Sequence, residues 1–152
     1  MTQALATVFE HAQRQRDEAL AKLMQAEEAA RLMLAQTEQL RNYRGEYAAR
    51  SPARGGRSAP IELLRCHLAF MQRLEQALAQ QQAVADSTEH HACALRLELV
   101  ALETRVASVR KLIERRGQAQ QLVADRQEQR RSDEASQQRA WRLRGDSMQI
   151  SH

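Results

Sequence analysis

The sequence predicts an all-α fold, a two-helix antiparallel coiled-coil hairpin with a longer, overhanging C-terminal helix. Three observations support this prediction. Alanine, leucine, glutamine, glutamate and arginine dominate the 152 residues, which include only five aromatic side chains, and such a composition is typical of long helices. Both prolines fall within residues 50–60. On either side of that segment, apolar residues recur with a seven-residue period, which predicts helices that wind around each other.

The first predicted helix covers residues 1–50. Alternating steps of four and three residues from Leu5 lead to thirteen positions, of which ten are apolar. We call these positions the first stripe: Leu5, Phe9, Ala12, Arg16, Ala19, Leu23, Ala26, Ala30, Met33, Thr37, Leu40, Arg44 and Tyr47. The period never slips, so one face of this helix is apolar along its whole length. Such a face needs a partner that covers it.

A loop is predicted at residues 51–59. Both prolines and two of the five glycines lie within residues 50–60, and these residue types are the strongest local interruptions of a helix. Pro52 disfavours helical geometry at the residue before it, which ends the first helix near Arg50. Pro60 suits the opening turn of the second helix. A connection this short makes the two helices antiparallel neighbours.

The second predicted helix covers residues 60–142. Its stripe has fifteen positions, twelve of them apolar, which we call the second stripe: Leu64, His67, Met71, Leu74, Leu78, Gln81, Ala85, Thr88, Ala92, Leu95, Leu99, Leu102, Val106, Val109 and Ile113. From about residue 107 the helix extends beyond the first helix. Apolar residues such as Leu122 and Val123 continue on this extension, which predicts another protein as its partner. Residues 143–152 are expected to form a disordered tail.

The expected ends of the helices also predict a register. If the hairpin closes between residues 50 and 60, the numbers of facing residues sum to about 110. Ala12 is then opposite Leu99, and His67 faces Arg44.

Charge is distributed unevenly along the chain, whose net charge is +4. Residues 1–50 hold seven basic and seven acidic side chains and residues 60–113 hold six of each, so the excess lies in residues 51–59 and 114–152. The last segment still carries six acidic residues, whereas a nucleic-acid-binding face usually concentrates Lys and Arg among aromatic residues. We therefore expect no nucleic-acid partner.

The sequence predicts a cytosolic protein without a disulfide. No segment has the length and apolar character of a membrane span or a secretion signal. Cys66 and Cys93 are 27 residues apart, which on one helix separates them by about 40 Å. Two cysteines at that distance do not bridge, and free thiols fit a reducing compartment.

No arrangement of residues predicts catalysis, a cofactor or a metal site. The chain lacks a phosphate-binding loop, a carboxylate pair and a nucleophile with an adjacent base. His90 and Cys93 lie one helical turn apart, but no further ligands accompany them, so we expect no metal there. Tyr43, Tyr47 and Phe70 are expected to gather beside the loop, where they either seal the end of the hairpin or form a recognition patch.

The whole chain resembles the FliJ family, the small component of bacterial flagellar type III protein export, which is related to the stalk proteins of injectisomes. The resemblance rests on the length and on the uninterrupted heptads around one loop. It also rests on segment 40–47 with its Tyr-x-x-x-Tyr, on Phe70 followed four residues later by Leu74, and on the Glu-Gln and Asp-Glu pairs of segment 126–134.

This resemblance implies a non-enzymatic stalk that inserts into the hexameric export ATPase of FliI type, reaches the export gate protein of FlhA type and escorts export chaperones. Its location would be cytoplasmic, peripheral at the inner face of the membrane through the gate. The gate-binding positions carried over from the family are Gln36, Leu40, Tyr43, Tyr47, Phe70, Leu74 and Ala77, whereas Gln81 departs from the histidine expected there. The arginines suited to acidic loops of an ATPase ring are Arg115, Arg116, Arg126, Arg130 and Arg131.

Two alternatives remain open at this stage. A free-standing secretion chaperone would bind unfolded clients along the apolar stripe of the extension. A structural coil would oligomerise through the same extension, for instance as a four-helix bundle.

Overall fold

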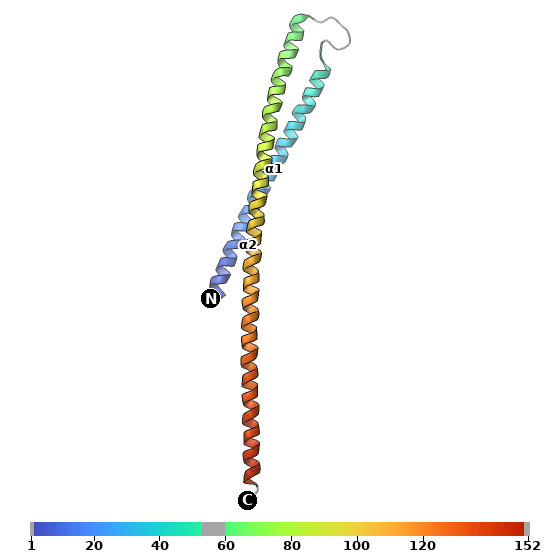
Figure 1. Ribbon diagram of the computed structural model, residues 1–152. Coiled ribbons are helices and arrows are strands. Elements are labelled where there is room, and N and C mark those ends of the chain that lie inside the picture. Colours follow the sequence, from blue (N-terminus) through green and yellow to red (C-terminus); the bar gives the residue numbers. More distant parts are fainter. Residues whose placement is uncertain (1, 53–59, 151–152) are drawn as a thin grey trace. The chain divides into compact units, whose positions relative to one another are not determined.

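Two long α-helices make up the structure, a computed structural model that describes residues 2–52 and 60–150 (Figure 1). They are α1 (Thr2–Ala49) and α2 (Ile61–Gln149). Within the described ranges the chain forms no strand, and the fold is the predicted all-α helical hairpin. Neither helix contains a stretch that is long and apolar enough to cross a membrane.

Hydrogen bonds at the facing ends of the helices explain where each one stops and starts. At the end of α1, the N–H of Arg50 donates to the carbonyl of Tyr47 at 3.1 Å, which closes the last turn tightly. Before α2, the carbonyl of Pro60 accepts from the N–H groups of Leu63 and Leu64 at 3.1 and 3.2 Å. Proline is well suited to this place because it has no N–H of its own to satisfy.

The far end of α2 differs from the expectation. The helix continues past residue 142 to Gln149, through residues that we expected to be disordered. No proline follows Pro60, and a lone glycine such as Gly145 costs only about 1 kcal/mol relative to alanine, so no local feature stops the helix. Of the loop expected at 51–59, residues 53–59 lie outside the described part of the chain.

The chain divides into two compact units, and each is described by itself: residues 10–106, and residues 1–9 together with 107–152. The first unit, which we call the hairpin unit, holds the packed part of both helices. Within the second unit, the guanidinium of Arg110 lies 5.7 Å from the centre of the Phe9 ring, which is a favourable cation–π distance.

Both stripes are protected from solvent as the seven-residue period predicts. All thirteen positions of the first stripe and all fifteen of the second are buried or half-buried. Among the other described helical residues, this protection extends only to Gln13, Gln15, Phe70 and Gln82. Alanines provide the most deeply buried positions, since Ala12, Ala85 and Ala92 are at most 1% exposed. Small side chains let two helical backbones approach closely.

The register of the hairpin is shifted from the expected one by about one heptad. Leu99 packs in a cluster with Ala19 and Leu23, and the expected position opposite Ala12 is wrong. A shift of seven residues places stripe on stripe again, so the apolar pattern fits both registers equally well.

Contacts near the loop show how this shift is accommodated. The ring of Tyr47, close to the end of α1, lies 4.3 Å from the ring of Phe70. Because α2 begins at Ile61, more than two turns of α2 precede this contact. The expected register assumed instead that both helices stop at the same level. Consequently Arg44 does not face His67 but pairs with Glu75 at 2.8 Å.

Polar members of the stripes are satisfied without disturbing the packing. Thr37 is 2% exposed, and its hydroxyl donates to the carbonyl of Met33 at 2.8 Å. Gln81 donates across the hairpin to the side-chain oxygen of Gln36 at 3.3 Å. Buried polar groups that keep a partner cost little stability, and the cross-helix bond supports the register that the structure adopts.

Candidate partner-binding surfaces

An aromatic cluster lies at the loop end of the hairpin unit, with Tyr47 at its centre. The Tyr47 ring stacks on His67 at 4.9 Å with an interplanar angle of 8°, and it meets Phe70 at 4.3 Å, tilted by 46°. Tyr43 lies one turn earlier on α1, 6.3 Å from Tyr47. The structure therefore brings together the three aromatic residues that the sequence places beside the loop, and adds His67 to them.

One residue of this cluster is exposed to solvent, and the other three are buried or half-buried. Tyr43 is 48% exposed, whereas His67 is only 9% exposed and Tyr47 and Phe70 are half-buried. Tyr47 thus holds the end of the hairpin together, while Tyr43 presents its ring to solvent. Of the two roles that the sequence left open, Tyr47 fills the structural one, and the exposed ring of Tyr43 is the candidate for recognition.

The remaining four predicted gate positions are also unequal. Leu74 is 7% exposed and belongs to the core, and Leu40 is half-buried on the first stripe. Gln36 and Ala77 are exposed. The exposed and half-buried members of the set have area to offer a partner, whereas Leu74 belongs to the packed core.

Seven positions on one flank of the hairpin seam, in the half nearer the loop, are uncharged. This flank consists of residues that immediately precede alternate members of each stripe. We call seven of them the uncharged flank: Ala29, Gln36 and Tyr43 on α1, and Leu63, Phe70, Ala77 and Val84 on α2. Four predicted gate residues belong to it. Sequence reasoning missed Leu63 and Val84, which are 54% and 48% exposed. Their spacing of seven residues from Phe70 and Ala77 is the signal that could have identified them.

The opposite flank is charged and links the two helices. The Nε of Arg96 donates to the carboxylate of Glu27 at 3.0 Å, and Arg41 donates to the side-chain oxygen of Gln82 at 3.0 Å. The hydrogen bond to Glu27 raises the pKa of the Arg96 guanidinium above its ordinary value. Exposed pairs such as this one contribute little stability, but they distinguish the two flanks chemically.

The five predicted ATPase-binding arginines lie on the part of α2 that follows the second stripe. Every described residue from Glu114 to Ile150 is exposed. None of the five forms an ion pair with another described residue. Two side-chain hydrogen bonds in this segment join glutamines to aspartates one turn away, as from Gln121 to Asp125 at 3.1 Å. The guanidinium groups are therefore available to an acidic partner.

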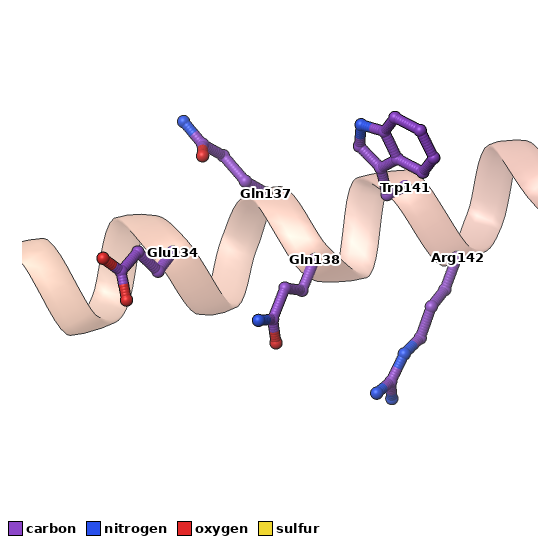
Figure 2. A pocket seen from close by; sticks show the side chains of 5 residues that line it. All are labelled: Glu134, Gln137, Gln138, Trp141 and Arg142. Atoms are coloured by element: carbon purple, nitrogen blue, oxygen red, sulfur yellow. The ribbon is translucent and has the colours of Figure 1, made fainter.

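Large apolar side chains accompany these arginines, and sequence reasoning assigned them no role. Trp141 is 79% exposed, Leu143 71% and Met148 78%. In Figure 2, Trp141 and Gln137 extend from one side of the helix, while Gln138 and Arg142 extend from the other. A tryptophan this exposed is unusual, because burying its ring is strongly favourable.

Within residues 2–52 and 60–150, chemistry-bearing side chains elsewhere do not assemble into a site. Cys66 and Cys93 are free and exposed, and the Cys93 sulfur lies 3.5 Å from the Arg96 guanidinium. Among the residues that the structure describes, no group of three or more His, Cys, Asp or Glu side chains could hold a metal ion.

Comparison with known proteins identifies the family of this chain. A family model described as "Flagellar FliJ protein" matches residues 1–145, a range that contains all the predicted gate residues and all five predicted ATPase-binding arginines. No curated protein and no solved structure matches the chain. Since the matched range covers nearly the whole sequence, the chain belongs to the FliJ family of flagellar protein export.

Proposed function

We propose that this protein is a non-enzymatic stalk of the flagellar export apparatus, with one binding surface for the export gate and another for the export ATPase. The observation that carries the proposal is the contrast between the two surfaces. The hairpin unit presents an uncharged, partly aromatic flank, whereas residues 114–150 present unpaired arginines and exposed apolar groups. Two surfaces of such different chemistry suit two different partners.

The uncharged flank is the proposed contact for a gate protein of FlhA type. Tyr43 supplies an exposed aromatic ring, and Leu63 and Val84 extend the same surface along α2. Aromatic anchors surrounded by uncharged groups are typical of the energetically dominant part of an interface. The half-buried Tyr47 and the buried Leu74 hold the anchors in position.

The tail, residues 114–150, is the proposed contact for the hexamer of an ATPase of FliI type. Its arginines suit acidic loops, and its apolar residues point in opposite directions. At 100° per residue, Trp141 and Met148 share one side of the helix and Leu143 lies on the other. A helix with apolar groups on opposite sides fits a partner that surrounds it better than one that covers a single face.

Such a stalk couples ATP hydrolysis to export without performing chemistry itself. It would reside on the cytoplasmic side of the membrane at the flagellar base, associated peripherally through the gate. Export chaperones are further proposed partners, which the stalk would receive and pass on.

The test of the ATPase contact is charge reversal in the tail. One variant replaces the five arginines at 115, 116, 126, 130 and 131 by glutamate, and a matched variant replaces the same five by lysine. Reversal should reduce stimulation of the purified ATPase about tenfold or more, while the lysine variant should retain most of it, because charge and not side-chain shape dominates an exposed contact. Binding to the gate protein should be the same for both variants.

Equal stimulation by both variants would remove the tail from the ATPase contact. Binding of many unfolded proteins by the full chain, with no effect on the ATPase, would favour a free-standing chaperone instead.

A further inference from the structure

The tail contains both a protruding group and a hollow of matching character. Trp141 is 79% exposed. Further back on the same helix, a shallow hollow of about 320 Å³ that is open to solvent is lined by Ala119, Gln120, Val123, Ala124 and Gln127. Both features lie on one face of the helix, because alternating steps of four and three residues, the spacing that defines the stripes, lead from Val123 to Trp141.

We propose that this face pairs with the same face of a second copy of the chain, antiparallel, so that each Trp141 ring enters the hollow of the other copy. Pairing Val123 with Trp141 places the two-fold axis beside Ser132. The next layer inward then pairs Gln127 with Gln137, two amides that can hydrogen-bond across the interface. The contact is isologous, so each interaction occurs twice.

Charge complementarity supports this register. The innermost layer pairs Arg130 of one copy with Glu134 of the other, and the symmetry repeats the pair. Shifting the pairing by one heptad in either direction separates Arg130 from Glu134. The same shift places Trp141 opposite an arginine, Arg116 or Arg130, instead of Val123. Arg131 lies close to its own counterpart beside the axis, so we expect a weak dimer that forms at high protein concentration.

Self-pairing goes beyond the proposed stalk function and competes with it, because it covers Arg130, one of the proposed ATPase contacts. Where the protein is concentrated enough to dimerise, the ATPase would have to displace the second copy before binding the tail. The experiments below use the protein alone, so their failure would leave the ATPase contact untouched, and failure of the ATPase contact would leave self-pairing untouched.

The first experiment measures the mass of the full chain by sedimentation equilibrium over a wide concentration range. The wild type should change from monomer to dimer as concentration rises. Trp141→Ala should shift the midpoint of association about tenfold or more to higher concentration, as expected for loss of a central aromatic anchor. Leu143→Ala is the matched control, because this similarly exposed residue lies on the opposite side of the helix. The midpoint of association of this variant should not move.

The second experiment exchanges the central charges. Arg130→Glu alone and Glu134→Arg alone place like charges opposite each other twice and should abolish the dimer. The double variant Arg130→Glu, Glu134→Arg restores opposite charges and should restore association. Circular dichroism checks that helix content is unchanged in each variant. A wild type that stays monomeric at every concentration, a dimer insensitive to Trp141→Ala, or a double variant no better than the single ones would each overturn the proposal.

Discussion

At the residue scale, Tyr43 and Tyr47 lie one helical turn apart but have different surroundings. Tyr47 lies on the first stripe and contacts Phe70 and His67 on α2. Tyr43 lies just beside the stripe, contacts only Tyr47 among the aromatic rings of the described residues, and is 48% exposed. The same residue type therefore stabilises the hairpin at one position and faces solvent at the other.

Replacing each tyrosine should separate these roles. Tyr47→Ala should lower the free energy of unfolding by about 2 kcal/mol, since a half-buried aromatic ring and its stacking contacts are lost. Tyr43→Ala should change it by less than about 0.5 kcal/mol, yet weaken binding to the gate protein. Urea unfolding followed by circular dichroism measures the first quantity and a pull-down the second. Tyr47→Phe is the control, because it keeps the ring, and a loss of stability as large as that of Tyr47→Ala would contradict the packing role.

The sequence could predict which aromatic residues meet, but not all of their contacts. Tyr43, Tyr47 and Phe70 lie close to the loop in either register, so their proximity follows from the hairpin alone. The stack of His67 on Tyr47 depends on the register and was not predicted. Leu74 lies on the second stripe, so its burial was predictable from the period, although the resemblance to a family places it among binding residues.

At the scale of the elements, the register is the property that the apolar pattern leaves undetermined. Stripes with a period of seven match after every shift of seven residues. The length of the connection and the individual polar contacts must then select one alignment. Arg44 with Glu75 and Arg96 with Glu27 form in the register of the structure, and such pairs are typical determinants of alignment between helices.

Paired cysteines test this register directly. In a chain with Cys66→Ser and Cys93→Ser, the pair Ala19→Cys and Leu99→Cys should oxidise readily to an intramolecular disulfide. The pair Ala12→Cys and Leu99→Cys should not, because one heptad of helix, about 10 Å, separates these positions and a disulfide requires closer backbones. Both variants share the loss of Leu99, which makes their stabilities comparable. Faster oxidation of the second pair, measured by non-reducing electrophoresis, would support the register expected from the sequence instead.

At the scale of the whole molecule, we propose that one chain carries two independent binding surfaces. The uncharged flank belongs to the hairpin unit, and the exposed arginines and apolar groups belong to residues 114–150. The two helices and their apolar faces followed from composition and period, whereas α2 continues to Gln149, beyond the predicted end at residue 142. Which exposed side chains of the tail bind a partner could not be predicted, because solvated charges and binding charges look alike in a sequence.

The most direct measurement of this claim is a bridging assay. The ATPase hexamer is immobilised, and capture of the purified gate protein is measured with the full chain, with a chain ending at Glu114, and with the variant Tyr43→Ala, Phe70→Ala. Only the full chain should capture the gate protein. The shortened chain should bind the gate protein but not the ATPase, and the double variant should show the reverse. If both altered chains still bridge, or if the full chain binds each partner but never both together, the account of a two-surface stalk is contradicted.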